Sequence, residues 1–172
     1  MKQIITVCTI AAMSFLTRTS DAQDKSTRPS PPAKATVTTT KGTTITIDYS
    51  QPSVKGRAIG KEIAKFGEVW RTGANEATIF EVSKDVTIAG KKLPAGKYGL
   101  YSIPGEKEWT IILNKKSDLW GSDGYSEADD ALRFTVKPAK AKTFTEKMTF
   151  GITESGLVSL MWGDVQVDFT VE

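Results

Sequence analysis

The sequence predicts an all-β domain, built as an antiparallel β-sandwich, with a barrel-like arrangement as the alternative. Apolar and polar residues alternate with period two in several segments, which is typical of half-buried strands. The 14 glycines and 7 prolines of the 172-residue chain supply frequent turn signals. No segment has the length and periodicity of an amphipathic helix that would be stable alone. We therefore expect about nine short strands, long loops and at most one or two short helical turns.

Residues 1–22 have the features of a signal peptide. Lys2 precedes an apolar stretch over residues 4–16, and Ser20-Asp21-Ala22 places small residues at a cleavage position. The apolar stretch is shorter than the roughly 20 residues that span a bilayer. We therefore expect cleavage after Ala22, an exported periplasmic or secreted protein, and no integral membrane span after cleavage.

Cleavage would remove Cys8, the only cysteine, and would leave 150 of the 172 residues. A cysteine-free chain in an oxidising compartment must be stable without disulfides, and a domain of this size buries about 68–70% of its unfolded surface. Residues 23–35 are rich in proline, serine and threonine and predict a flexible linker. Residues 36–172 are then expected to form a single β-sandwich domain.

The charge balance excludes one class of partner. Removing residues 1–22 takes away Lys2, Arg18 and Asp21, so the net charge falls from +3 to +2. A net charge so close to zero does not indicate the basic surface that nucleic-acid binding requires. We expect no nucleic-acid partner, and no motif indicates a cofactor.

The strands are predicted in order along the chain. Residues 43–49 alternate apolar and polar positions. Residues 86–88 and 96–103 are predicted to form a hairpin or near-hairpin around Gly90 and Pro94. The remaining predicted strands cover residues 109–114, 132–136, 148–152 and 165–172, with Gly156 separating the last two.

Two tryptophans and two short segments complete this outline. Trp109 and Trp162 lie within strand patterns and are expected in the core. The segments Ile59–Phe66 and Ser126–Ala131 are the two that can hold a helical turn, the second with Ser126 as its N-cap.

Four separated segments carry the residues most suggestive of a site. They are Tyr49 to Arg57, Val69 to Thr78, Leu93 to Tyr98, and Trp120-Gly121 with Tyr125. In this order they resemble the motifs of the domain of unknown function 2911 family, secreted proteins of Gram-negative bacteria, over nearly all of residues 36–172. The resemblance implies an exported, predominantly β domain and no particular activity. The chain differs at Gln51, where the family often carries a basic residue.

The motifs predict a polar, aromatic-lined cleft. Arginine forks suit carboxylate or phosphate groups, and exposed rings beside amides and carboxylates commonly hold a sugar or an extended peptide. The candidate ligand-binding residues are Tyr49, Arg57, Trp70, Arg71, Asn75, Glu76, Trp120 and Tyr125. The alternative is structural: Arg71 pairs with Glu76 or Asp48 and stacks on Trp70 to lock the loop, while the rings cap the core.

A cluster of acidic residues follows Lys116. Its members are Asp118, Asp123, Glu127, Asp129 and Asp130. Oxygen ligands of this kind can hold calcium, but the spacing does not match an EF-hand. A solvated acidic turn is favoured, and no metal site is predicted.

Catalysis has few candidate groups, because the chain contains no histidine. Asp48 and Glu76 are a possible carboxylate pair, which as a glycosidase would need a separation of about 5–5.5 Å or 6.5–9.5 Å. We predict a noncatalytic binding module for an envelope ligand or protein. The alternatives are a carboxylate-based hydrolase acting on an envelope glycan or peptide, and a purely structural envelope module.

Export makes a direct prediction. When the full chain is expressed in a Gram-negative host, the mature protein should begin at Gln23 and appear outside the cytoplasm. Amino-terminal sequencing of the fractionated protein checks this. A chain that keeps Met1 and stays in the cytoplasm would contradict the assignment.

Overall fold

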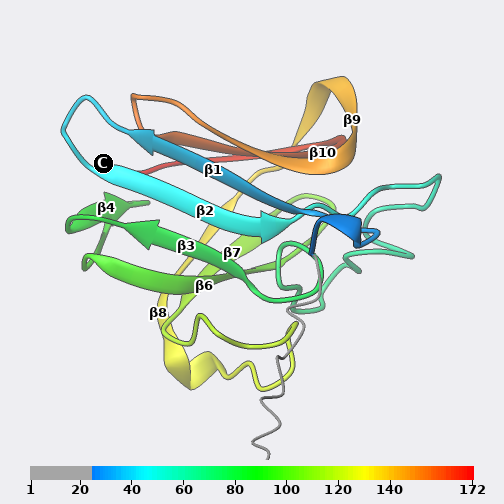
Figure 1. Cartoon of the computed structure of the whole chain (residues 1–172), viewed down its shortest axis with the longest axis horizontal. Helices are drawn as coiled ribbons and strands as arrows, with labels where there is room; N and C mark the ends of the chain where they lie inside the picture. The colour runs from blue at the N-terminus through cyan, green and yellow to red at the C-terminus, as the bar shows by residue number, and fades with distance from the viewer. Residues whose placement is uncertain (1–24) are drawn as a thin grey trace, which may run out of the picture.

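Two layers of antiparallel strands form the fold (Figure 1). The structure is a computed structural model that describes residues 25–172. One layer is a six-stranded sheet in the order β1-β2-β3-β6-β7-β8, and the other is the hairpin of β9 and β10. The strands are β1 (Pro32–Thr38), β2 (Thr44–Ser50), β3 (Thr78–Val82), β4 (Val86–Ile88), β5 (Lys91–Leu93), β6 (Gly96–Ile103), β7 (Trp109–Asn114), β8 (Asp130–Val136), β9 (Ala139–Ile152) and β10 (Leu157–Thr170). The all-β, sandwich-like prediction is confirmed, and the sheets do not close into a barrel.

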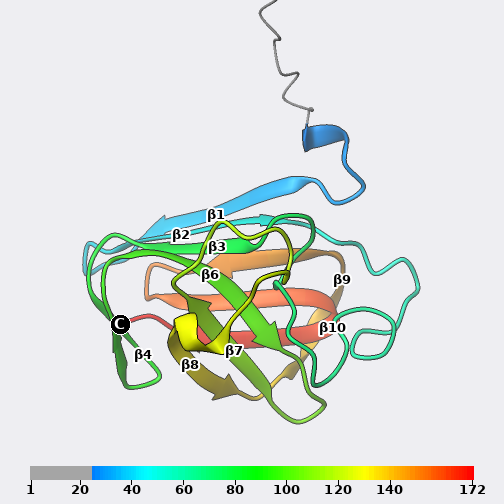
Figure 2. The same ribbon diagram turned by 90° about the horizontal axis from the view of Figure 1, so that it is seen from below.

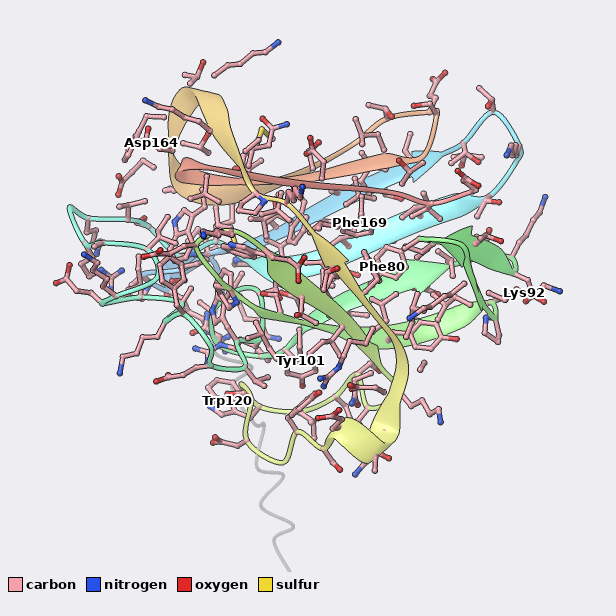
Figure 3. The ribbon with its side chains drawn as sticks, turned by 180° about the vertical axis from the view of Figure 1, so that it is seen from behind. Phe80, Lys92, Tyr101, Trp120, Asp164 and Phe169 are labelled. Atoms are coloured by element: carbon pink, nitrogen blue, oxygen red, sulfur yellow. The ribbon has the colours of Figure 1, made fainter. Side chains whose placement is uncertain are left out.

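Aromatic contacts join the two layers. The rings of Phe80 on β3 and Phe134 on β8 lie 6.2 Å and 5.5 Å from the ring of Phe169 on β10. Figure 3 shows Phe80 and Phe169 in this interior. Trp109 and Trp162 are each 2% exposed, so their predicted place in the core is confirmed.

The period-two pattern of β2 is also confirmed. Ile45, Ile47 and Tyr49 are buried on the inner face of the sheet, while the residues between them are only partly buried. The hydroxyl of Tyr49 accepts a hydrogen bond from the backbone N–H of Phe150 at 3.1 Å, which ties β2 to β9. Beyond β2 the chain crosses to the other layer, where the N–H of Val54 donates to the carbonyl of Glu146 at 2.9 Å.

The outer face of the six-stranded sheet is covered by loops. Tyr101 and Ile112 are fully buried there with Ala77, in a cluster separate from the main core. Two segments provide the cover: residues 69–77, called the motif loop, and residues 115–129, called the covering loop. Figure 2 shows the covering loop passing over β6 and β7. Polar motif residues and buried apolar residues therefore share one side of the molecule.

Two predictions about the strands need correction. The hairpin pairs β4 with β5 around Ala89 and Gly90, both of which have positive φ, while β6 belongs to the large sheet. The first strand begins at Pro32, inside the segment expected to be a linker. Proline suits the first position of an edge strand, where no ladder hydrogen bond from its nitrogen is needed.

The predicted helical turns are only partly present. Ile59 and Ile63 form an isolated bridge within a series of turns instead of a helix. The 3-10 turn η2 (Glu127–Asp129) follows Ser126, whose side chain makes no cap hydrogen bond. A further 3-10 turn, η1, covers Lys25–Thr27. Among residues 25–172 no helix is long and apolar enough to span a membrane. The predicted signal peptide, residues 1–22, lies outside the described residues.

The interlayer packing predicts the effect of a cavity. Phe80→Ala should lower the free energy of unfolding by about 3–5 kcal/mol, because the ring is fully buried against Phe169. Phe144→Ala, at a side chain that is 54% exposed, should change it by less than about 0.5 kcal/mol. Chemical denaturation of both variants measures the difference. Equal effects would contradict the assigned core.

Candidate functional site

The motif loop is anchored to the sheet through Trp70. The backbone N–H groups of Trp70 and Ser102 each donate to the other residue's carbonyl at 2.8 Å. The indole Nε1 of Trp70 donates to the carbonyl of Gly73 at 3.0 Å, and its ring stacks on Trp162 with centroids 5.3 Å apart. The predicted stacking of Arg71 on Trp70 is therefore not what orders this loop. Trp70 serves as a structural anchor.

Three contacts dock the covering loop against the motif loop. The N–H of Ala77 donates to the carbonyl of Leu119 at 3.0 Å, and the N–H of Gly121 donates to the carbonyl of Asn75 at 3.1 Å. Between these contacts, Glu76 and Trp120 form an isolated antiparallel bridge. The side chain of Trp120 remains 60% exposed. The docking thus places an exposed indole next to Glu76.

Glu76 binds two basic residues from the start of the described chain. Nη1 of Arg28 donates to both carboxylate oxygens of Glu76 at 3.0 Å, and Nζ of Lys25 lies 3.1 Å from Oε1. Burial acts to raise the pKa of Glu76, but hydrogen bonds from its own backbone, Arg28 and Lys25, with the charge of Lys25, outweigh it and lower the pKa to about 2. Glu76 is therefore ionised at neutral pH.

The segment from Arg28 to Pro31 is held along the same surface. Nδ2 of Asn75 donates to the carbonyl of Ser30 at 3.1 Å, and the backbone N–H of Gln51 donates to the carbonyl of Pro31 at 2.9 Å. Asn75 itself has φ of +59°, a conformation that asparagine tolerates better than most residues. Asn75 and Glu76 thus bind this chain's own N-terminal segment.

A cavity of about 280 Å³ lies between this segment and the sheet, and we call it the outer-face groove. Its lining comes from η1, β1, β2, β3 and the end of the motif loop. The lining residues are Lys25, Pro32, Ala33, Asp48, Tyr49, Ser50, Glu76, Ala77 and Ile79. Asp48 and Glu76 therefore line one cavity, as the hydrolase hypothesis requires, whereas the side chain of Tyr49 lies in the core and bonds to Phe150.

The ion pairs of Asp48 and Glu76 show that the predicted pairing of Arg71 with either carboxylate is wrong. Asp48 pairs with Lys34 at 3.1 Å, and Glu76 pairs with Arg28 and Lys25. Arg71 takes part in none of the ion pairs among the described residues. Its Nε is buried and has no hydrogen-bond partner there. The motif loop is therefore ordered without an ion pair from Arg71.

Arg57 and Tyr125 lie apart from the groove lining. Nη2 of Arg57 donates to the carbonyl of Ser53 at 2.7 Å and its Nε donates to that of Val54 at 3.1 Å, so this side chain braces its own loop. The structure thus places Glu76 in the groove wall with Asn75 and Trp120 beside it. The side chain of Tyr49 is instead buried in the core on the inner face of the sheet, and Arg57 lies elsewhere.

The hydroxyl of Tyr125 belongs to a network at β8. It donates to the carboxylate of Asp130 at 3.0 Å and accepts from Nη2 of Arg133 at 2.8 Å. Burial, followed by the hydrogen bond and charge of Asp130, raises the pKa of Tyr125 to about 12 against the opposing effect of Arg133. Asn114 completes the network by donating to Asp130 at 2.9 Å. Tyr125 therefore orders the end of the covering loop.

The acidic residues of the covering loop are mostly neutralised by neighbouring bases. Lys116 pairs with Asp129 at 2.8 Å, and Arg133 pairs with Glu127 at 3.3 Å and with Asp130 at 2.9 Å. No group of three or more metal-ligating side chains occurs within residues 25–172. These ion pairs join the covering loop to itself and to β8.

Sequence reasoning missed three partners that define this region. Arg28 and Lys25 lie in the segment interpreted as a linker, about fifty residues from Glu76, and Arg133 lies in a strand pattern. No local spacing rule connects such distant residues.

Comparison with known proteins supports the relationship suggested by the motifs. A family model described as Protein of unknown function (DUF2911) matches residues 30–171. The chain therefore belongs to this family. Searches of curated proteins and of solved structures give no significant match.

The lowered pKa of Glu76 predicts an acid-sensitive contribution to stability. A depressed folded-state pKa stabilises the fold above the unfolded value near 4.5, and this contribution is lost as pH falls through about 2. The difference in unfolding free energy between wild type and Glu76→Gln should therefore be largest above about pH 5 and disappear below about pH 2. Denaturation at a series of pH values measures it. A difference independent of pH would contradict the ion-pair assignment.

Proposed function

We propose that this member of the DUF2911 family is an exported binding module that holds a ligand in the outer-face groove without reacting with it. Export follows from the signal-peptide features of residues 1–22. The observation that supports binding is the groove itself, a cavity of about 280 Å³ lined by Asp48 and Glu76. This volume is slightly below the range of about 300–1,000 Å³ for small-molecule sites, so it suits a small group or one side chain of a larger ligand.

The groove has the chemistry to bind a basic group. Glu76 already holds the guanidinium of Arg28, whose side chain is only 18% exposed, and Asp48 holds the ammonium of Lys34. Pro32, Ala33 and Ile79 supply an apolar surface on which the aliphatic stem of a basic side chain can lie. The proposed ligand is an envelope peptide that presents lysine or arginine.

Trp120 offers a second contact to such a ligand. Its ring is 60% exposed, and its backbone pairs with Glu76 at the groove wall. An exposed indole face attracts ammonium and guanidinium groups through a cation–π interaction. A carboxylate beside an indole is therefore a matched environment for a basic side chain.

A carboxylate-based hydrolase is disfavoured by the state of Glu76. A glycosidase needs one of its two carboxyl groups protonated at working pH, so that it can act as a general acid. The pKa of Glu76 is lowered to about 2. Asp48 is paired with Lys34 at 3.1 Å. The pair is therefore better arranged to hold positive charge than to transfer protons.

The structural-module alternative is favoured by a different observation. Trp70, Asn75 and Tyr125 all use their polar atoms within the protein. These contacts explain why the motif loop is ordered. A purely structural role does not explain why the groove has two carboxylates in its wall. The binding proposal therefore rests on the groove and not on these contacts.

Calorimetric titration with a capped lysine-rich tetrapeptide tests the proposal. Wild-type protein should bind it, and Glu76→Gln or Asp48→Asn should weaken binding by about tenfold or more, because a hydrogen bond to a charged group is worth about 1.5–3 kcal/mol. A capped glutamate-rich tetrapeptide should not bind. Glu81→Gln is the matched control, since Glu81 pairs with Lys97 at 3.6 Å and does not line the groove.

Two results would contradict groove binding. One is equal binding of the lysine peptide to wild type, Glu76→Gln and Asp48→Asn. The other is an equal loss of binding in Glu81→Gln, which would show that only net charge matters. Absence of binding by every peptide, with a stability loss in Glu76→Gln, would favour the structural module.

A further inference from the structure

Two buried polar groups near the motif loop have no hydrogen-bond partner among the described residues. Within residues 25–172, four buried side-chain nitrogen or oxygen atoms have no hydrogen-bond partner. Two of them are Nε of Arg71 and the hydroxyl of Tyr101. Most buried polar groups in folded proteins are hydrogen-bonded, so each exception needs an explanation.

Tyr101 lies on the outer face of β6, beneath the covering loop. The residue is 0% exposed, and its ring lies 5.1 Å from the ring of Tyr125. Figure 3 shows Tyr101 and Trp120 on the same side of the molecule, away from Phe80 and Phe169. Burial and the charge of Asp118 raise the pKa of Tyr101, while the charge of Arg71 acts to lower it. The guanidinium is therefore within electrostatic reach of the hydroxyl.

Arg71 is held close to the backbone of the covering loop. A Cβ atom added to Gly121, whose φ is +66°, would lie 3.1 Å from Nη1 of Arg71. Arg71 is half-buried, and no ion pair among the described residues includes it. The glycine thus lets the chain pass directly over a guanidinium that has no anionic partner.

The neighbouring polar groups do not share this lack of partners. Oγ1 of Thr72 donates to Oγ of Ser102 at 3.0 Å, and Oγ1 of Thr78 donates to the carbonyl of Thr72 at 2.9 Å. The loops around Arg71 are therefore well satisfied. The two unpartnered groups are a local exception within an ordered network.

We propose that Arg71 and Tyr101 form a binding site for an oxyanion, a carboxylate or a phosphate group, at the junction of the motif loop and the covering loop. Arginine presents a planar fork of donors that matches both groups. A tyrosine that stays protonated at neutral pH supplies a further O–H donor. Neither residue lines the outer-face groove, so this site goes beyond the proposed function.

Binding of inorganic phosphate and of acetate to the intact protein tests this site. Thermal unfolding is followed with each anion at constant ionic strength, with chloride as the reference. At least one of the two anions should raise the melting temperature by a few degrees above chloride. Stabilisation by phosphate alone would identify a phosphate site, and stabilisation by acetate alone would identify a carboxylate site.

Variants separate a ligand role from a structural one. Arg71→Lys keeps the charge but loses the fork, and should weaken anion binding by about tenfold. Tyr101→Phe removes only the hydroxyl; it should also weaken binding while leaving the melting temperature without anion unchanged or raised, because the lost group has no partner. Arg57→Lys is the control, since Arg57 donates to its own loop.

Three outcomes would overturn the assignment. The first is that neither anion stabilises the protein more than chloride, and the second is that Arg71→Lys responds as wild type does. The third is that Tyr101→Phe lowers the melting temperature but leaves the anion response intact. Glu76→Gln should keep the anion response. Failure of the groove proposal would appear as lysine-peptide binding that is lost in no groove variant, and failure of this site would appear as a missing response to the anions.

Discussion

Covering the outer face of the six-stranded sheet is the constraint on which the rest of the structure depends. Tyr101 and Ile112 present apolar surface there, and among residues 25–172 only loops lie over it. Loops that pack on a sheet must satisfy their own backbone groups. Hydrogen bonds from Ala77 to Leu119 and from Gly121 to Asn75 do so by joining the two loops to each other. The docking positions Glu76 and Ala77 at the groove wall and forms the junction around Arg71.

This constraint explains why the motif loop mixes such different side chains. Trp70 and Asn75 hold the loop, one by stacking on Trp162 and one by binding Ser30. Glu76 extends the docking to the N-terminal segment through Arg28. Arg71 is the exception, because its Nε is buried without a partner. A loop that is already stable can leave one guanidinium free, and this is why we assign the anion-binding role to Arg71.

Local patterns predicted the strands better than the contacts between them. The alternation in β2 and the core positions of Trp109 and Trp162 followed from side-chain periodicity, which depends only on neighbouring residues. The partner of β4 was predicted wrongly, because both β5 and β6 follow a turn signal and only packing decides between them. The pairing of Glu76 with Arg28 joins residues 48 positions apart, which no spacing rule can reveal. Sequence reasoning therefore produced one list of candidate residues, and the structure was needed to separate those that order the loops, such as Trp70 and Tyr125, from those that line the groove.

Amide hydrogen exchange of the loop junction tests this account most directly. The N–H groups of Ala77 and Gly121 are the donors that dock the two loops. The N–H of Phe150 in β9 donates to the hydroxyl of Tyr49 at 3.1 Å and is a reference in the core that involves neither loop. We predict that Ala77 and Gly121 are protected from exchange to nearly the same extent as Phe150. Exchange of both amides at the rate of an open loop, with Phe150 still protected, would show that the loops are not docked. The groove wall and the Arg71 junction would then not be preformed.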